Sequence, residues 1–278
     1  MDYFNTYDVN KSIDEMNGKI KEMRNTGNAL VYSIPLFLIS VGVLLYFYVL
    51  EELWFLSIFA GVSLFLFILG QLIKNVSIRH LTMNKLLNSE TINQYNSEHE
   101  TNVTYTYNPK NSKTFNENMG LFTRYSSASI KYQIKLDSKT KLIFTTIQTN
   151  SGNSNQIHFS GIYLIFDEEG YTNFQVRTNG KPHQKGKKFI KEEREDIKLF
   201  KLENEDRIRF NYNAVLSKLE EYKKKYIASN GAEVHIAFSK FKTTYKHKNV
   251  DYENFREYYH QIESLLNLVF QIKDVVNQ

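Results

Sequence analysis

The sequence contains no cysteine, and this absence excludes several kinds of chemistry. A disulfide framework, a thiol nucleophile and a thiolate metal site all require cysteine. Glycine and proline are scarce as well, at 12 and 3 of 278 residues, and no glycines are spaced closely enough to form a loop that cradles phosphate. Asn, Lys, Ile, Tyr and Phe are abundant instead, a composition typical of proteins from AT-rich bacterial genomes.

Charge is missing from two long stretches near the N-terminus. Residues 29–50 and 53–73 contain no Asp, Glu, Lys or Arg, although the chain as a whole is polar, with a mean hydropathy of −0.44. At 1.5 Å per residue each stretch spans roughly 30 Å as a helix, the thickness of the hydrocarbon core of a bilayer. Only Glu51 and Glu52 separate the two stretches, so the helices must run antiparallel. The sequence therefore predicts a transmembrane hairpin, with Trp54 among the interfacial aromatic residues near its turn.

Small residues in both stretches are predicted to let the two helices approach closely; they are Ser40, Gly42, Gly61 and Ser63. Three other interpretations of the stretches remain. A cleaved signal peptide would need an earlier and shorter apolar run. A buried hairpin in a soluble protein would need a large surrounding core. A single span followed by a re-entrant segment would still place the chain in a membrane.

Basic residues in the short flanks predict the orientation of the hairpin. They occur in the N-terminal tail and after the second stretch, and the turn between the stretches has none. We therefore expect a multi-pass protein of the cell membrane with both termini in the cytoplasm, and the lipid bilayer as its first partner. The basic residues are Lys11, Lys19, Lys21, Arg24, Lys74, Arg79 and Lys85.

Hydrophobic periodicity divides the rest of the chain. Residues 1–28 are predicted as a cytoplasmic amphipathic tail, because apolar residues recur there at helical spacing. Residues 74–118 are predicted as a juxtamembrane helix, which continues to about Tyr95, and a linker that holds at most one strand. Residues 119–278 are predicted as a single cytosolic α+β domain.

Alternation of apolar and polar residues predicts the strands of the soluble part. Residues 214–222 then switch to helical spacing, and an apolar stripe over 255–276 predicts a long amphipathic helix that packs on the sheet, against another helix or in a coiled coil. The predicted fold class is α+β: a two-helix transmembrane hairpin, then a cytosolic mixed, mainly antiparallel sheet domain with a long C-terminal amphipathic helix. The candidate strands are 103–107, 129–136, 142–149, 157–167, 174–178, 197–202, 207–212, 234–238 and 241–245.

Four segments have a familiar pattern. They read GLFTRY at 120–125, HFSGIYLIFD at 158–167, DRIRFNY at 206–212 and VHIAF at 234–238. Together with the two apolar stretches, they resemble the bacterial membrane-protein family known as domain of unknown function 3137. The resemblance implies two spans followed by a cytosolic α+β domain, and it implies no established activity or catalytic residue. The chain departs from the family at 126–129, where acidic residues are replaced by Ser-Ser-Ala-Ser, and at 210–214, where Arg, Thr and Pro are missing.

The chain offers no recognisable catalytic constellation. Its seven His residues include no i, i+4 pair and lie in no familiar ligand pattern with a carboxylate, so we expect no metal and no cofactor. Ser160 and Gly161 lack the context of a hydrolase nucleophile. The acidic run at 167–169 is interpreted as a turn with solvated charges, with cation binding as the alternative. No catalytic residue is predicted, and enzymatic activity is left open with the weight against it.

Lysine is concentrated in one segment, at Lys181, Lys185, Lys187, Lys188 and Lys191. In a domain held under an anionic leaflet, each basic residue near the surface gains about 1 kcal/mol of attraction. The segment is therefore a candidate membrane-surface loop that binds anionic lipid headgroups. The alternatives are a solvated loop, balanced by the acidic residues that follow it, and a nucleic-acid contact, which we do not expect.

These features favour a membrane-anchored, cytosolic-facing interaction or scaffold module of the bacterial cell envelope, with an unidentified protein partner. The alternative is an enzyme or binding protein that acts on lipid headgroups or nucleotides at the inner leaflet. That function would require convergent polar groups in one pocket. A transporter is the weakest hypothesis, because two spans without an ionisable residue offer no pathway. The groups that the enzyme hypothesis would bring together are Arg124, His158, Asp167 and His235.

Overall fold

The chain forms two compact units in the computed structural model. The helical unit comprises Met1–Gln94 and Thr244–Tyr259, and the sheet unit comprises Tyr95–Thr243 and His260–Gln278. Two helices, α4 (Ser77–His99) and α6 (Tyr252–Val276), contribute residues to both units. The structure describes residues 9–48, 53–75, 77–107, 109, 121–122, 127–151, 154–178, 180–182, 188–194, 197–203, 208–239 and 250–278.

The N-terminal tail is helical, as its periodicity predicts. Ile13, Met16 and Ile20 are all buried along it, and the helix continues into the first apolar stretch through a short π-helical turn. The juxtamembrane helix α4 is confirmed as well and ends four residues beyond the predicted end at Tyr95. The remaining elements of the helical unit are α1 (Val9–Asn28), the π-helical turn η1 (Ala29–Ser33), α2 (Ile34–Tyr48) and α3 (Leu53–Asn75).

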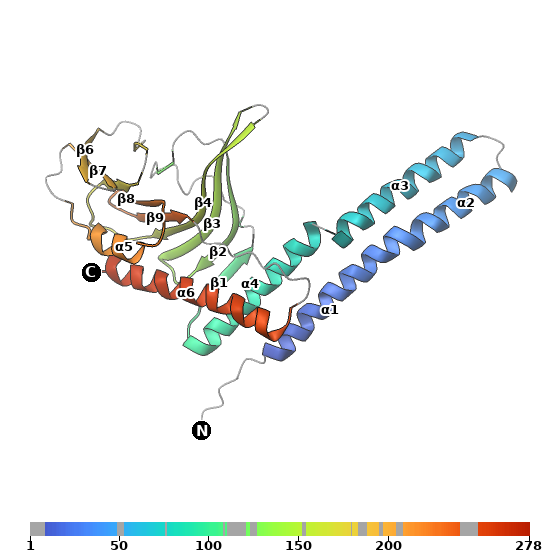
Figure 1. The fold of residues 1–278 in the computed structure, drawn as a ribbon, viewed down its shortest axis with the longest axis horizontal. Helices are drawn as coiled ribbons and strands as arrows, with labels where there is room; N and C mark the ends of the chain where they lie inside the picture. Colours follow the sequence, from blue (N-terminus) through green and yellow to red (C-terminus); the bar gives the residue numbers. More distant parts are fainter. Residues whose placement is uncertain are drawn as a thin grey trace, which may run out of the picture. The chain divides into compact units, whose positions relative to one another are not determined.

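Helices α2 and α3 lie side by side (Figure 1). Near one end of the pair, Gly42 on α2 faces Phe59 on α3, where an added Cβ would lie 2.9 Å from the ring. Near the other end, Gly70 on α3 faces Val31, where an added Cβ would lie 2.8 Å from the backbone nitrogen. Increasing residue numbers on one helix meet decreasing numbers on the other, so the predicted antiparallel hairpin is confirmed. The turn at 49–52 is outside the described residues.

The small residues of the hairpin divide into two groups. Gly42 and Ser63 lie in the contact between the helices, as predicted. Gly61 has no atom within 4 Å of an added Cβ, and Ser40 is exposed, so the prediction is wrong for these two. The tightest approach occurs at Gly70, which the sequence analysis did not single out. Small residues are frequent throughout the hairpin, and sequence alone does not reveal which face of each helix they occupy.

The π-helical turn lies directly before a proline. Pro35 has no N–H to donate to the carbonyl of Val31, and its ring crowds that carbonyl, so regular α-helical bonding is interrupted there. The turn widens, and the Ile34 N–H bonds the Ala29 carbonyl five residues back. The Pro35 carbonyl accepts a hydrogen bond of 3.2 Å from the Ser63 hydroxyl. This bond connects the distorted turn to α3.

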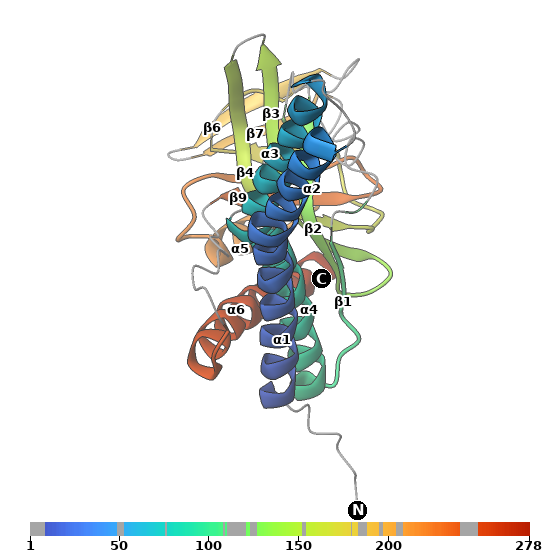
Figure 2. The ribbon, with the colours of Figure 1, turned by 90° about the vertical axis from the view of Figure 1, so that its right-hand side faces the viewer.

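Nine described strands form one sheet in the order β1-β2-β3-β4-β9-β8-β5-β7-β6. Every described pairing is antiparallel, so the prediction of a mainly antiparallel sheet is confirmed without its mixed component. The two longest strands, β3 and β4, form an extended hairpin (Figure 2). The strands are β1 (Thr104–Tyr107), β2 (Ser127–Lys135), β3 (Thr140–Ser151), β4 (Ser154–Phe166), β5 (Phe174–Arg177), β6 (Phe189–Arg194), β7 (Ile197–Leu202), β8 (Lys225–Ser229) and β9 (Val234–Ser239).

Strands β6 and β8 were not predicted, and one predicted strand is wrong. Within 207–212, the described residues Ile208 to Asn211 are irregular. Their alternation has another cause: Phe210 is buried and stacks on Phe174 at 5.4 Å between ring centroids. Asn211 then caps helix α5 (Tyr212–Lys218) by accepting a hydrogen bond of 3.2 Å from the Ala214 N–H. The predicted strand at 241–245 lies outside the described residues.

Both faces of the sheet carry buried apolar side chains. On one face Phe122 stacks on Phe159 at 4.7 Å and lies edge-on to Tyr226 at 5.0 Å. Residues that alternate with this cluster along the strands, such as Leu164 and Ile236, point to the opposite face and are fully buried too. The full cluster on the first face is Leu121, Phe122, Ala128, Ile130, Ile143, Ile147, Phe159, Tyr163, Ile165, Tyr226, Ala228 and Ala237.

Gly161, in the middle of β4, is required by a close backbone approach. It pairs with Ser239 on β9, and an added Cβ would lie 2.4 Å from the Phe238 carbonyl oxygen. No side chain larger than hydrogen fits at that distance. The glycine therefore has a structural role in bringing β4 and β9 together.

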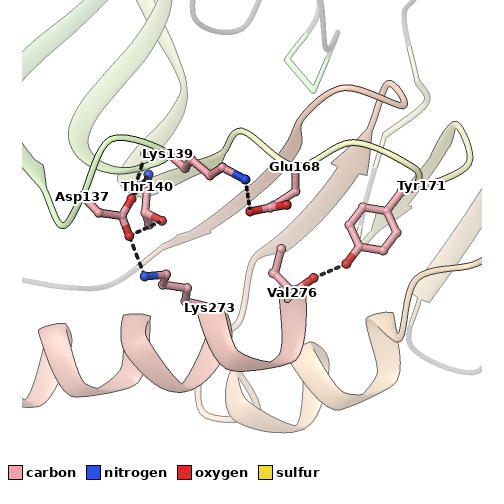
Figure 3. Close-up of polar contacts among 7 residues, drawn as sticks. All are labelled: Asp137, Lys139, Thr140, Glu168, Tyr171, Lys273 and Val276. Atoms are coloured by element: carbon pink, nitrogen blue, oxygen red, sulfur yellow. Dashed lines mark hydrogen bonds and ion pairs between the residues drawn. The ribbon is translucent and has the colours of Figure 1, made fainter. Parts of the chain in front are cut away.

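The part of helix α6 from His260 onward, which belongs to the sheet unit, runs along the sheet (Figure 1), and the apolar stripe of the helix is buried as predicted. Figure 3 shows how polar contacts fix its C-terminal half within the sheet unit. The Lys273 ammonium donates to Asp137 at 2.5 Å, and the same carboxylate accepts from the backbone N–H groups of Lys139 and Thr140 at 2.8 and 2.6 Å. The Tyr171 hydroxyl bonds the carbonyl at the C-terminal end of the helix.

Helix α6 also contacts another helix, because Tyr258 donates to Asn88 of α4 and Tyr95 of α4 donates to Asn267. Packing on the sheet and against another helix are thus both observed among the alternatives left open.

Candidate functional site

The exposed apolar surface of the α2–α3 hairpin is the main candidate functional feature of the described chain. Large apolar side chains point outward along both helices: Phe37 is 66% exposed, Phe47 73% and Phe65 64%. Soluble proteins rarely expose such a continuous apolar surface, because it has no favourable contact with water. Two described helical stretches, Asn10–Tyr48 and Leu56–Ile73, are long and apolar enough to cross a membrane, and 17% and 11% of their apolar windows are buried. The hairpin surface supports association with a membrane.

The lysine segment is only partly described. Lys181, Lys188 and Lys191 are exposed, and the positions of Lys185 and Lys187 fall outside the described residues. Lys191 lies on strand β6, opposite Phe200 of β7, so this end of the predicted loop is a strand. On the same pair of strands, Lys201 forms an ion pair of 3.1 Å with Glu192. Glu192, which directly follows the last of these lysines, therefore neutralises part of the local positive charge.

The acidic run after β4 has lysine partners. Asp167 lies 3.6 Å from the Lys141 ammonium, and Glu168 lies 3.2 Å from that of Lys139. Gly170 follows with a φ of 95°, the left-handed conformation that ends the run in a turn. These ion pairs are the arrangement expected of a charged surface turn. The residues belong to no group of potential metal ligands among the described parts of the chain.

A series of hydrogen-bonded polar side chains lies at the start of β9. The ring nitrogen Nδ1 of His235 is 2.7 Å from the Tyr163 hydroxyl, and Nε2 is 3.1 Å from the Glu233 carboxylate. Burial lowers the pKa of His235, although Glu233 and Asp167 oppose that shift. The hydrogen bond from His235 lowers the pKa of Glu233. His235 is therefore neutral at physiological pH and links a buried tyrosine to a half-exposed carboxylate.

The groups named for an enzymatic pocket do not converge. His235 pairs across the sheet with Ile165, two residues before Asp167. His158 lies seven residues from Ile165 along β4, and strands rise about 3.3 Å per residue, so roughly 23 Å separates it from His235. Arg124 is outside the described residues. This dispersal along β4 opposes the hypothesis of one catalytic pocket that uses His158 and His235 together.

A buried arginine belongs to the sheet rather than to a pocket. Arg177, on β5, donates to the Gln175 side chain at 2.9 Å and to the Leu121 carbonyl at 2.6 Å. Its guanidinium also lies 5.5 Å from the centre of the Tyr226 ring. Burial lowers its pKa to about 10, so the group stays protonated at neutral pH. These contacts connect the 121–122 segment to the sheet.

Histidine and glutamate side chains from two helices meet near the end of α4. His99 Nε2 lies 3.1 Å from one Glu263 oxygen, and His260 Nδ1 lies 3.0 Å from the other. Donor atoms of Glu98, His99 and Glu263 all lie within 4.8 Å of one another. Burial alone would raise the pKa of Glu263, but the hydrogen bonds from the two imidazoles outweigh that effect and lower it.

No metal site was expected from the sequence, and its motifs do not reveal this cluster. His99 and His260 are 161 positions apart in the sequence, so nothing local indicates that they come together. One signal was present: His260 and Glu263 are spaced i, i+3 within a strongly periodic helix, which places both on the same face. The search for i, i+4 histidine pairs did not include that spacing.

The segments that carry the family resemblance lie mostly on neighbouring parts of the sheet unit. Residues 158–166 belong to β4 and 234–238 to β9, which pair directly, and Leu121 and Phe122 pack on the face beside them. Thr123 to Tyr125 and residues 206–207 are outside the described residues. Comparison of the chain with protein-family models, with curated proteins and with solved structures finds no match.

Proposed function

We propose that the α2–α3 hairpin anchors this protein in a bacterial cell membrane, with both termini in the cytoplasm, and that the sheet unit serves there as an interaction or scaffold module. The observation that carries the proposal is the outward exposure of large apolar side chains on both helices. Apolar side chains are stable in contact with lipid, whereas in water they would drive association of copies of the protein. The divergent resemblance to the domain of unknown function 3137 family belongs to the same proposal.

The orientation rests on charge. Lys19, Lys21 and Arg24 precede the hairpin on α1, and basic residues also follow α3, whereas the 49–52 turn has two glutamates and no basic residue. Basic flanks stay preferentially on the cytoplasmic side. Both units outside the hairpin would then share one compartment.

The proposed interaction role rests on the hydrogen bonds that the polar groups of the sheet unit make within the fold. Arg177 and His235 are buried, and both have hydrogen-bond partners that tie the fold together. Buried polar groups that are satisfied in this way rigidify a scaffold. An unidentified protein partner is therefore proposed in preference to a substrate.

Membrane extraction and reporter fusions test the anchor and its orientation. We expect the full chain to stay in the membrane pellet after alkaline carbonate washing and to require detergent for release. A reporter active only outside the cytoplasm should be silent when fused after residue 278 and active when inserted between Glu51 and Glu52. Release by carbonate, or the opposite reporter pattern, would overturn the corresponding part of the proposal. Affinity capture from detergent-solubilised membranes that recovers no specific protein would contradict the interaction role.

A second candidate is binding of anionic lipid headgroups by the lysine segment, favoured by the exposure of Lys181, Lys188 and Lys191. Their attraction to an anionic surface would reach about 1 kcal/mol per residue. The test is co-sedimentation of residues 95–278 with vesicles of neutral or anionic phospholipid, provided that this piece is first shown to fold. Equal binding of the wild type and of a variant with Lys181, Lys188 and Lys191 changed to Gln would contradict it.

A further inference from the structure

We propose that Glu98, His99 and Glu263 bind one transition-metal ion of the zinc class, while His260 holds the second oxygen of Glu263. The site lies within the sheet unit, where the end of α4 meets α6. The inference does not depend on the membrane anchor. A bound metal ion would link two helices, α4 and α6, that are far apart in the sequence.

The two helices present their donors with suitable spacing. His260 and Glu263 are three residues apart on α6, so both project from one face. His99 lies in the last turn of α4, and Glu98 precedes it. Glu263 occupies the centre, because each of its oxygens already contacts one imidazole.

The distances are close to those of a metal site. Zinc binds imidazole nitrogen and carboxylate oxygen at about 2.0–2.1 Å, which places neighbouring donors of a tetrahedral site roughly 3.3 Å apart. One Glu263 oxygen lies 3.1 Å from His99 Nε2, and the donor atoms of Glu98, His99 and Glu263 all lie within 4.8 Å of one another. An ion therefore needs side-chain rotations that bring these three donors closer together, and the exposed side chains of Glu98 and His99 are able to make them.

The chemistry of the donors selects the class of ion. Imidazole with carboxylate suits zinc and its neighbours in the first transition row, whereas magnesium and calcium prefer oxygen donors alone. Solvent reaches the site, since the side chains of His99 and His260 are 35% and 54% exposed.

His99 also has a supporting contact. The Tyr95 ring lies 4.3 Å from the His99 ring, and the Tyr95 hydroxyl is held by Asn267 of α6 at 3.3 Å. Such neighbours fix the orientation of a ligating imidazole and increase metal affinity. The competing interpretation is a cluster of hydrogen bonds that binds no metal and only joins α4 to α6.

Zinc titration of the full chain in detergent micelles separates these two interpretations. The protein is purified with a tag that contains no histidine, and Zn²⁺ is titrated in competition with a chromophoric chelator. We expect one equivalent of tight binding. Glu263→Gln should weaken it by about 100-fold, because this change removes the central charged ligand. The matched control is Glu257→Gln, an exposed carboxylate on the same helix, which should leave the affinity unchanged.

Co²⁺ provides a second measurement that does not depend on affinity alone. Tetrahedral Co²⁺ has strong visible absorption bands, which we expect for the wild type and for the control His158→Gln, but not for the variant His99→Gln. Circular dichroism of each variant establishes that it is folded. No stoichiometric Zn²⁺ binding by the wild type, or the same affinity and the same spectrum in the variants, would overturn the proposal and leave the hydrogen-bonded cluster.

Discussion

The same residue type occupies opposite environments in the two units. Phe37 and Phe65 of the hairpin are 66% and 64% exposed, whereas Phe159 and Phe174 of the sheet unit are 1% and 0% exposed. Removal of a phenylalanine ring from water lowers the free energy. Buried rings are therefore expected of a unit surrounded by water, and exposed rings of a surface that faces an apolar medium. The sheet unit buries its aromatic rings among its own strands, and the hairpin leaves its rings exposed, as a helix pair associated with a membrane does.

The two regions also differ in how their elements are held together. In the hairpin, contact depends on positions where side chains are absent, at Gly42 and Gly70. In the sheet unit, it depends on interlocking large side chains such as Phe122, Phe159 and Tyr226. Between lipid-facing helices there is little hydrophobic driving force, so close backbone approach and hydrogen bonds replace it. Four substitutions test this comparison.

The largest expected effect comes from truncating the same residue type in each region. Phe174→Ala should cost about 3–5 kcal/mol of stability in the sheet unit, because it leaves a cavity against Phe210 and Tyr212. Phe65→Ala should change stability by about 0.5 kcal/mol or less, since no packed contact is lost. Hydrogen exchange of the full chain in detergent, measured for peptides from each unit, checks both values. A comparable loss for Phe65→Ala would show that its ring packs against protein.

The next effect concerns the glycines of the hairpin. Gly70→Leu should destabilise the pairing of α2 and α3 by about 1–3 kcal/mol, because its side chain overlaps the Val31 backbone. Gly61→Leu is the matched control, since no atom lies within 4 Å of an added Cβ there. Faster hydrogen exchange of residues 27–35 in the first variant alone is the expected result. Equal exchange in both variants would mean that the Gly70 contact does not hold the hairpin.

A smaller effect is expected from the series of hydrogen-bonded polar side chains at His235. Because its pKa is lower in the folded state, the unfolded state binds more protons below about pH 6.5, and stability falls as the pH decreases through that value. The nearby charged groups are Glu233, Asp167 and Lys141. His235→Gln should cost about 1–3 kcal/mol near pH 8 and reduce the further loss between pH 7 and pH 5. Urea unfolding across this range measures both quantities, and an unchanged pH slope would contradict the assignment.

The smallest effect is expected at the ion pair between α6 and the β2–β3 turn. Lys273→Met should cost about 1 kcal/mol or less, because both side chains are partly exposed and solvent screens their attraction. Although burial opposes the shift, the Lys273 and backbone hydrogen bonds lower the pKa of Asp137. In the wild type this contribution is present above the unfolded pKa of Asp137 and is lost as the pH falls through its lower folded value. Urea midpoints measured at neutral and acidic pH should differ less in the variant.

Periodicity predicted the long elements well. The stripe of α6, the alternation of β2 and the run of β4 are each specified by many residues, so a single exception does not hide the pattern. Strand β8 is short, follows a segment with helical spacing and is buried on both faces, so it shows no alternation. Strand β6 is dominated by charge and pairs only with β7 in the described sheet. Both strands depend on their neighbours more than on their own sequence.

The candidate sites were less predictable, because they depend on contacts between distant residues. The apolar hairpin is local and was found from the sequence. The His99–Glu263 contact joins positions 164 residues apart, and the His235–Tyr163 contact joins positions 72 apart. Neither spacing follows a rule that one sequence reveals. They become visible only when the strand order and the course of α6 are known.

Strand β6 lies at one end of the described sheet, and its last four residues are Lys191, Glu192, Glu193 and Arg194. The free edge of a sheet is a template on which another chain can add a strand, and charged side chains discourage that addition. Confinement to a membrane surface raises the local concentration of neighbouring copies, and with it the risk of edge-to-edge aggregation. The charged residues of β6 would then disfavour edge-to-edge pairing of sheets between neighbouring copies of this protein.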